Sequence, residues 1–303
     1  MDGILPLWKP RGMTSHDCVM KIRRIFKTRK VGHTGTLDPE VEGVLPICIG
    51  KATKVVPFLT DTKKTYIAEL KLGKTTETED SYGEIVETME VEAFPETDEI
   101  DTCFKSFLGV TEQIPPMYSA VKVNGKKLYE YARANKEVER PIRNIEIYSI
   151  KRLAQNKNDQ TIRFQVTCSK GTYIRTLCVD IGKRLGYPAH MSFLERTQTG
   201  NFTKKEAVTF EQLEKTATEA ERAAWLKPLL SGVDHLSSIE VSEQIKRKVQ
   251  HGQKLPRPDE LPRTNPFLMV HHGELLAIYQ LHEKSKQEIK PVRVFQLDKK
   301  VGE

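Results

Sequence analysis

Hydrophobic residues recur along this chain with two periods, and each period predicts a type of secondary structure. Between Lys64 and Leu72 apolar and polar residues alternate, which is typical of a strand with one buried face. Between Thr14 and Lys27 apolar residues recur at helical spacing, and Thr14 with Asp17 fits a capping box. The pattern therefore predicts a helix followed by a half-buried strand.

The rest of the chain continues this mixture of elements. The dipeptide Asn124-Gly125 predicts a tight hairpin between Val121 and Leu128. Further helices are predicted over 96–108, 172–185, 210–230 and 242–249, and further strands over 147–153, 161–168, 275–281 and 291–297. There is no regular alternation of strand and helix, so we expect an α+β fold. After residue 235 the sequence becomes rich in turn residues and short apolar strands. This change predicts two domains, residues 1–235 and a small β-rich domain of residues 236–303.

Basic and acidic residues are unevenly distributed along the chain. The 303 residues include 48 Lys and Arg against 41 Asp and Glu, a net charge of +7. Residues 20–30 hold six bases and no acid, whereas residues 75–103 hold eleven acids and no base. We interpret the first block as a surface for a polyanion and the second as a surface that avoids one. On charge alone, a basic enzyme with a small-molecule substrate is an equal alternative.

Other classes of protein are disfavoured by what the sequence lacks. It has no CxxC, HExxH, GxGxxG or Walker pattern, so we expect neither a metal nor a nucleotide cofactor. The chain has five cysteines, an odd number, so the sequence does not indicate a framework of disulfides. This favours a reducing compartment. The first residues do not resemble a signal peptide, and no apolar run approaches the roughly 18 residues of a membrane span. We therefore expect a cytoplasmic protein that does not bind membranes.

The most informative candidate for chemistry is Asp38, in a loop rich in glycine and hydroxyl residues. Gly35 lets the backbone pass close to a ligand, and Pro39 stiffens the residue that follows the carboxylate. A carboxylate held on such a loop can be a nucleophile, a base or a metal ligand. The residue types alone leave these three roles open.

Three further features could belong to the same site, and each has an ordinary alternative. Tyr66 is either a core residue or a ring that stacks on a flat substrate. Arg175 lies where a helix dipole disfavours a cation, so it is either a surface residue or the partner of an anion such as Asp38. Residues 121–143 hold seven bases and three acids with interleaved tyrosines, which fits either a nucleic-acid clamp or a solvated hairpin. The stretch 189–200 has no clean periodicity and suggests no function.

Seven blocks of residues, in order along the chain, resemble the bacterial tRNA pseudouridine-55 synthases of the TruB type. The blocks are Lys9–Ser15, Gly32–Lys54, Lys64–Tyr66, Thr76–Asp80, Pro115–Arg133, Gly171–Arg175 and Ala189–Gly200. They cover residues 1 to about 235, and the departure is Trp8, where a polar residue usually precedes Lys9. The resemblance implies a mixed-sheet pseudouridine synthase core with inserted helices and a thumb hairpin, followed by a PUA-like RNA-binding domain.

The same resemblance implies a chemistry and a role for each site residue. Asp38 would be the nucleophile that detaches uracil, attacking either the sugar or the base, Tyr66 would stack on the uracil, and Arg175 would pair with Asp38. A uridine in a folded loop must flip out before it reacts. The residues expected to bind substrate around this trio are Lys9, His33, Gly35, Lys64, Lys122, Tyr173 and Leu194.

These implications define the expected partners and the alternatives. The substrate would be the T arm of tRNA, acted on by a monomer without a guide RNA or a protein partner. One alternative is a binding or folding protein for tRNA that has lost catalysis, and another is the related guide-RNA-dependent subunit. The trio of Asp38, Tyr66 and Arg175 argues against the first, because binding alone does not need it. The short N-terminus and the lack of a lysine-rich tail argue against the second.

Overall fold

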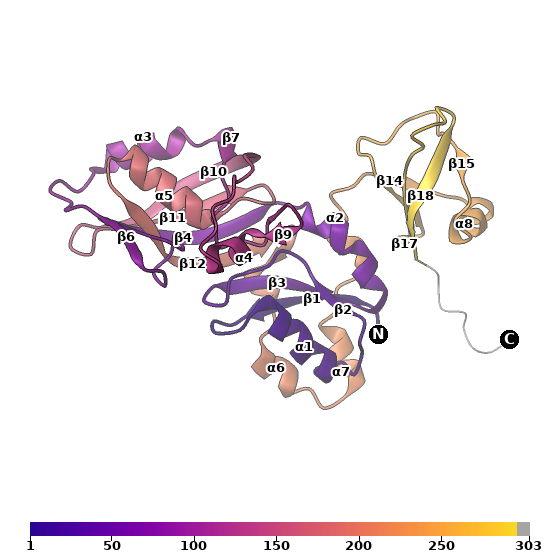
Figure 1. Cartoon of the computed structure of the whole chain (residues 1–303). Helices are drawn as coiled ribbons and strands as arrows, with labels where there is room; N and C mark the ends of the chain where they lie inside the picture. Colours follow the sequence, from indigo (N-terminus) through magenta and orange to yellow (C-terminus); the bar gives the residue numbers. More distant parts are fainter. Residues whose placement is uncertain (296–303) are drawn as a thin grey trace.

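The elements of the chain are arranged around one large sheet and one smaller sheet (Figure 1). The structure is a computed structural model that describes residues 1–295. The strands are β1 (Gly3–Lys9), β2 (Val31–His33), β3 (Glu42–Ile49), β4 (Lys64–Leu72), β5 (Lys74–Thr76), β6 (Ile85–Thr88), β7 (Gly109–Gln113), β8 (Lys122–Val123), β9 (Lys126–Lys127), β10 (Arg143–Asn156), β11 (Thr161–Cys168), β12 (Ala189–Thr199), β13 (Phe202–Thr203), β14 (Ser238–Glu240), β15 (Leu255–Pro256), β16 (Phe267–His271), β17 (Glu274–Leu281) and β18 (Glu288–Val294). The helices are α1 (Ser15–Ile25), α2 (Val56–Thr60), α3 (Thr97–Lys105), α4 (Leu128–Arg133), α5 (Ile174–Arg184), α6 (Phe210–Glu214), α7 (Glu219–Ala224) and α8 (Glu243–Gln250), with 3₁₀ turns η1 (Gly50–Val55), η2 (Lys204–Glu206) and η3 (Leu229–Gly232).

The large sheet is mixed, and one of its interior strands, β12, comes late in the sequence. Its order is β1-β3-β12-β4-β11-β10-β7, with β2 and β13 attached beside it. β12 runs parallel to β3 and antiparallel to β4, so it joins the N-terminal strands to the middle of the chain. A mixed sheet with irregularly inserted helices is an α+β fold, and the predicted fold class is confirmed.

Helices cover the two parts of this sheet separately. In Figure 1, α1, α6 and α7 lie beside β1–β3, while α3 and α5 lie against β10–β12. Apolar side chains of α1 pack on β1 and β3 in one cluster, and those of α3 and α5 pack on β4, β10 and β11 in another. Helix α5 follows β11 directly, so its N-terminus is held over the middle of the sheet.

The smaller sheet lies in the C-terminal part of the chain, with the strand order β14-β16-β17-β18-β15. It has its own buried cluster, in which α8 packs through Val249. A second cluster joins it to the large sheet, where Leu268 and Ile278 lie in one apolar group with Ile4 and Val44. The prediction of two domains divided near residue 235 stays a prediction. Within residues 1–295, no helix is long and apolar enough to cross a bilayer.

The strongest local patterns gave the correct elements. Helix α1 begins after Thr14, whose hydroxyl caps Asp17 N at 3.0 Å, and the reciprocal Asp17 contact completes the capping box. Strand β4 has the predicted bounds, Lys64–Leu72, with alternate residues buried. Asn124 and Gly125 both have positive φ, at 50° and 80°, as an Asn-Gly hairpin turn requires.

The prediction of one long helix over 210–230 was wrong. The segment forms α6, α7 and the turn η3 instead. Thr218 has an extended backbone and caps Glu221, so a new helix starts inside the predicted one. Helix α7 ends at Ala224 with Trp225 as its C-cap, and Pro228 precedes the separate turn η3.

Other predictions were incomplete. Strand β16, a fully buried run between turns, was not predicted, and neither was the short helix α4 within the predicted thumb. Strand β10 is longer than the predicted 147–153. The last strand was predicted over 291–297 but occupies Glu288–Val294, and residues 296 and 297 lie outside the described residues.

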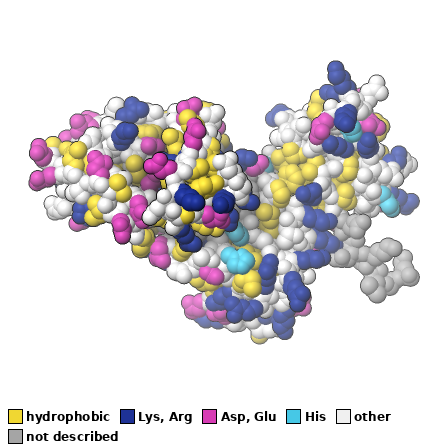
Figure 2. Space-filling model, viewed as in Figure 1, with side chains coloured by type: hydrophobic (Ala, Val, Ile, Leu, Met, Phe, Trp, Pro, Cys, Tyr) yellow, Lys and Arg dark blue, Asp and Glu magenta, His cyan; other side chains and the backbone are white. Residues whose placement is uncertain are grey.

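The charge blocks lie on different parts of the surface. The basic block 20–30 lies on α1 and the turn after it, and the acidic block 75–103 covers β5, β6 and α3. Figure 2 shows Lys and Arg gathered over the part that holds α1, and Asp and Glu spread over the part that holds α3 and β6. The molecule therefore presents surfaces of opposite charge.

Candidate active site

Asp38 lies in the loop between β2 and β3, and buried polar contacts hold this loop in place. Ser15, at the start of α1, accepts a hydrogen bond from Leu37 N at 3.0 Å. The buried Lys9 amine donates to Pro39 O at 3.0 Å and to Val41 O at 2.6 Å. Because the residue before Asp38 is tied to α1 and the residues after it are tied to β1, the carboxylate is presented on a rigid loop.

The carboxylate of Asp38 is paired with an arginine from another part of the chain. Arg175 Nε lies 3.1 Å from Asp38 Oδ2, and the arginine side chain is 7% exposed while that of Asp38 is 45% exposed. Burial on the arginine side lowers the local dielectric and strengthens the attraction. The pair that the sequence suggested is present, and one face of the carboxylate is open to an incoming group.

Arg175 is itself fixed by the helix start that carries it. Tyr173, the N-cap of α5, donates its N–H to the side chain of Gln113 at 2.8 Å, and Gln113 donates back to Tyr173 O at 3.0 Å. The other guanidinium nitrogens of Arg175 donate to Thr78 O and Tyr118 O, each at 2.9 Å. These contacts aim Nε at Asp38 and join three segments that are far apart in sequence.

Two hollows of about 400 and 420 Å³ meet at this pair. Asp38, Val41, Tyr118, Arg175 and Leu194 line both of them. The second hollow is also lined by Gly35, Lys64, Tyr66 and Tyr173, so seven of the ten residues predicted for the site lie around one cavity. A space of this size can hold a single base with part of its sugar.

The floor of the second hollow is built by two neighbouring strands. Tyr66 on β4 is directly opposite Arg196 on β12, and Ala68 is opposite Leu194. Burial raises the pKa of Tyr66, and the nearby positive charge of Arg196 acts in the opposite direction. The Tyr66 hydroxyl therefore keeps its proton at neutral pH and lies beside a fixed cation.

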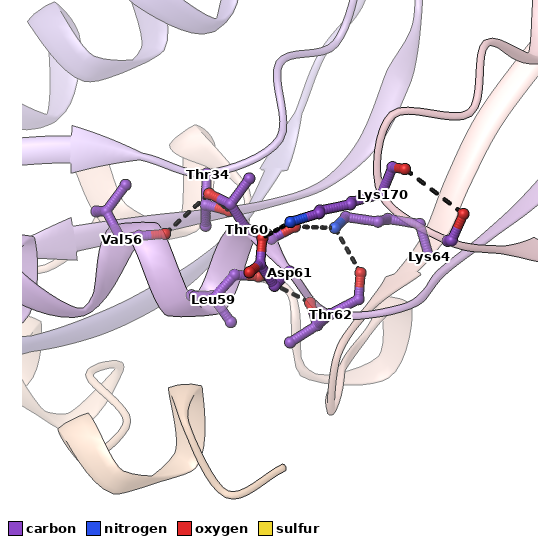
Figure 3. A network of polar contacts seen from close by, with 9 residues as sticks. Thr34, Val56, Leu59, Thr60, Asp61, Thr62, Lys64 and Lys170 are labelled. Carbon is purple, nitrogen blue, oxygen red and sulfur yellow. Dashed lines mark hydrogen bonds and ion pairs between the residues drawn. The ribbon is translucent and has the colours of Figure 1, made fainter. Parts of the chain in front are cut away.

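Lys64 forms a second charged cluster at the end of this hollow (Figure 3). Its amine donates to the carbonyl oxygens of Thr60 and Thr62, and the neighbouring Lys170 pairs with Asp61 at 2.6 Å. Burial lowers the pKa of Lys64 to about 8, and the charge of Arg196 contributes in the same direction. A cation that is buried among carbonyl groups is a structural support whose charge is sensitive to pH.

The family of the chain is shown by comparison with known proteins. Residues 23–174 match the family model described as the N-terminal domain of TruB family pseudouridylate synthase, and residues 175–237 match that of the tRNA pseudouridylate synthase B C-terminal domain. A protein named tRNA pseudouridine synthase B from Oceanobacillus iheyensis is 59% identical over 99% of this chain and 100% of its own length. The chain belongs to the TruB family of pseudouridylate synthases.

Further relatives and solved structures agree with this assignment. A tRNA pseudouridine synthase B from Listeria monocytogenes is 50% identical over 98% of this chain and 99% of its own length. Among solved structures, a chain of a Cbf5-Nop10-Gar1 complex matches with a TM-score of 0.76 and 29% identity, over 97% of this chain and 85% of that one. An H/ACA ribonucleoprotein bound to a substrate RNA containing 2'-deoxyuridine matches with a TM-score of 0.74 and 26% identity, over the same shares.

Three predicted site residues of this TruB-family chain do not line the second hollow. Lys9 is buried behind the Asp38 loop and holds it through backbone carbonyls. His33 ends β2, and burial lowers the pKa of its imidazole, whose Nδ1 is buried without a hydrogen bond to any residue in 1–295. Lys122 lies exposed on the hairpin beside a separate depression.

Two residues in the site of this TruB-family chain were missed from the sequence. Arg196 is 1% exposed on β12, within the stretch to which no function was given. Tyr118 lines both hollows and donates to Glu77 at 3.2 Å. A charged residue two positions after an apolar one in a strand could have signalled Arg196, because both lie on the same face. Within residues 1–295, no cluster of three His, Cys, Asp or Glu is placed to hold a metal.

Proposed function

We propose that the protein converts uridine-55 in the T loop of tRNA into pseudouridine, with Asp38 as the nucleophile. One observation carries this proposal: the half-exposed Asp38 carboxylate, paired at 3.1 Å with buried Arg175, opens on a cavity lined by Tyr66 and Leu194. The isomerisation needs a carboxylate that is ionised, aimed and close to a flat base. The relatives named tRNA pseudouridine synthase B support tRNA as the substrate.

The reaction begins when the Asp38 carboxylate forms a bond to the nucleotide. If it attacks the sugar, its oxygen bonds to carbon 1′, and the electron pair of the broken bond to nitrogen 1 stays on the base. If it attacks the base, its oxygen bonds to carbon 6, and the electron pair moves onto the ring and its oxygen. On either route the bond between nitrogen 1 and carbon 1′ has broken before the base turns and carbon 5 bonds to carbon 1′. The Asp38 bond then breaks and restores the carboxylate, the proton on carbon 5 leaves, and nitrogen 1 gains a proton.

The residues around Asp38 would bind the flipped base and its sugar. Tyr66 stacks on the uracil and takes part in proton movement, while Leu194 packs against the ring. Gly35 and Tyr173 border the nucleotide, since both line the hollow beside Asp38. Lys64 supports the wall of the pocket through its bonds to Thr60 and Thr62.

The remaining predicted residues would act on the RNA outside this pocket. His33 fills part of the stack that the flipped uridine leaves, and its lowered pKa keeps the ring uncharged at neutral pH, as stacking favours. Lys9 holds the Asp38 loop. Lys122 belongs to the thumb, residues 121–143, which closes over the RNA backbone, and residues 236–303 form a PUA-like domain that binds another part of the tRNA.

The enzyme would work as a monomer on tRNA alone, in the cytoplasm, where tRNA is processed. The solved relatives include chains from guide ribonucleoproteins. The relatives named for tRNA are far more similar, at 59% and 50% identity against 29% and 26%. We therefore expect no guide RNA and no protein partner.

Release of tritium from carbon 5 of uracil tests the function. The protein alone is incubated with a tRNA transcript tritiated at that carbon, and about one tritium should be released for each T loop. Asp38→Asn should bind the transcript and release nothing, whereas the control Asp98→Asn, on exposed α3, should behave as wild type. Absence of release at stoichiometric wild-type enzyme would refute the proposed function.

A further inference from the structure

Among residues 1–295, Arg196 is the largest side chain that is almost completely buried, and its charge has no acidic partner there. It is 1% exposed and lies on β12, an interior strand of the large sheet between β3 and β4. Across residues 1–295, no carboxylate lies within ion-pairing distance of it. Its guanidinium donates to the carbonyl oxygens of Val44 and Gly35 and also lies beside the Tyr66 hydroxyl. A buried guanidinium without a counter-charge costs stability, so its position calls for a functional reason.

The contacts of Arg196 lie at the two ends of the Asp38 loop. Nη2 donates to Gly35 O at 2.7 Å, three residues before Asp38. Nε donates to Val44 O at 2.8 Å, where β3 has begun. The backbone of Arg196 also pairs with Gly43, where an added Cβ would lie 2.3 Å from Arg196 O. One side chain and its backbone therefore fasten the loop where it leaves β2 and where it enters β3.

The same guanidinium borders the cavity in which the base would lie. Arg196 lines the hollow of about 420 Å³ together with Asp38 and Tyr66. Tyr66 is its direct neighbour across the strand pair. The charge of Arg196 also acts on two other groups. Burial is the main cause of the lowered pKa of Lys64 and of His33, and the charge of Arg196 is the second cause in each case. The floor of the pocket therefore has a fixed positive charge.

The proposed reaction creates a negative charge in this pocket. Before the attack the charge is on Asp38, where Arg175 balances it at 3.1 Å. After the attack Asp38 is an uncharged ester or adduct, and the electron pair is on the base, whether carbon 1′ or carbon 6 was attacked. Arg175 thus stabilises the starting state, and a cation free of any carboxylate is needed for the state that follows.

We propose that Arg196 fastens both ends of the Asp38 loop and provides the fixed positive charge that stabilises the anionic base during isomerisation. This inference rests on the proposed function. It assigns to Arg196 two effects that can be separated by experiment, the position of the loop and the charge on the pocket floor. The second effect acts only while the base carries negative charge, so it should change the rate and leave RNA binding nearly unchanged.

The first test compares Arg196→Lys and Arg196→Gln with the control Arg184→Lys, an exposed position on α5. Tritium release is followed in a single turnover, and RNA binding is measured in parallel. Arg196→Gln should lose roughly 10²–10³-fold in rate, and Arg196→Lys, which keeps the charge without both carbonyl contacts, should lose less. Arg184→Lys should match wild type. If both Arg196 variants react at the wild-type rate, or if neither binds RNA, the inference is refuted.

The second test isolates the charge by making the base anion intrinsically more stable. Transcripts with 5-fluorouridine in place of the target uridine are used, because fluorine withdraws electrons from the ring, and loss of the starting nucleoside is followed by chromatography. The rate ratio of wild type to Arg196→Gln should be about tenfold smaller for 5-fluorouridine than for uridine. An equal ratio for both bases would mean that Arg196 is only structural. Wild-type enzyme that converts neither base would instead refute the proposed function.

Discussion

Arg175 Nε lies 3.1 Å from Asp38 Oδ2, while the same guanidinium donates to Thr78 O and Tyr118 O at 2.9 Å. These contacts join the Asp38 loop to the segment after β5 and to the segment that leads into the β8–β9 hairpin. An arginine can do this because its donors are fixed in one plane and point in several directions. The position of Asp38 is therefore coupled to the base of the hairpin.

Arg175→Lys should reduce the rate of isomerisation more than RNA binding. Lysine keeps the charge but cannot reach the carboxylate and both carbonyls at once, so the loss of one or two charge-assisted hydrogen bonds should lower the rate by roughly 10- to 100-fold. Single-turnover tritium release and RNA binding measure the two effects. The control is Arg184→Lys on the same helix. A wild-type rate for Arg175→Lys would show that catalysis does not need the simultaneous contacts of the guanidinium with Asp38 and the two carbonyl oxygens.

Tyr66→Phe separates the ring of this residue from its hydroxyl. The variant keeps the flat ring on β4, so RNA binding should change little. Burial raises the pKa of Tyr66, so the hydroxyl is protonated at neutral pH and can donate or relay a proton. Its loss should lower the single-turnover rate by about 10²-fold or more. Tyr148→Phe, at a half-exposed position on β10, should leave the rate unchanged. Full activity of Tyr66→Phe would leave only stacking as its role.

Lys64 should make the stability of the protein depend on alkaline pH. Its pKa is about 8 in the folded protein, and the ordinary value of 10.5 applies to the unfolded chain. Below pH 8 both states carry the charge, and its burial destabilises the folded state. Between pH 8 and 10.5 the unfolded state binds more protons than the folded state, so the contribution of Lys64 to the free energy of unfolding rises with pH.

Urea unfolding of wild type and Lys64→Met at about pH 7.5 and about pH 10 measures this effect. The free energy of unfolding of wild type relative to the variant should rise between the two pH values. Lys71→Met, an exposed position on the same strand, should show no such change relative to wild type. A difference that is constant with pH would mean that Lys64 titrates normally.

Lys126→Gln should weaken RNA binding and reduce its dependence on salt. Lys126 is exposed at the hairpin turn, whereas Lys127 is partly engaged, since its amine donates to the Tyr129 hydroxyl at 3.3 Å. Loss of one phosphate contact should change the slope of log affinity against log salt by about 0.7 to 0.9. Binding titrations at several salt concentrations measure the slope, with Lys105→Gln on acidic α3 as the control. An unchanged slope for Lys126→Gln would mean that the hairpin tip does not contact phosphate.

Several parts of this protein could be predicted from the sequence because they depend on interactions between residues that are close together in the chain. The capping box at Thr14, the alternation over Lys64–Leu72 and the turn at Asn124-Gly125 depend on residues a few positions apart, and all three were confirmed. Seven ordered blocks, including the one around Asp38, indicated the family for a similar reason, because each block is a short continuous run of the chain.

Long-range packing decided the rest. The segment 210–230 has a helical composition, but α6 ends at Glu214 and a new helix, capped by Thr218, ends at Ala224. Strand β12 carries a mixed sequence, and its parallel pairing with β3 and antiparallel pairing with β4 buried Arg196 beside Tyr66 and both ends of the Asp38 loop. Such contacts join residues more than 100 positions apart, and burial of the sheet faces, which no local pattern encodes, brings them together.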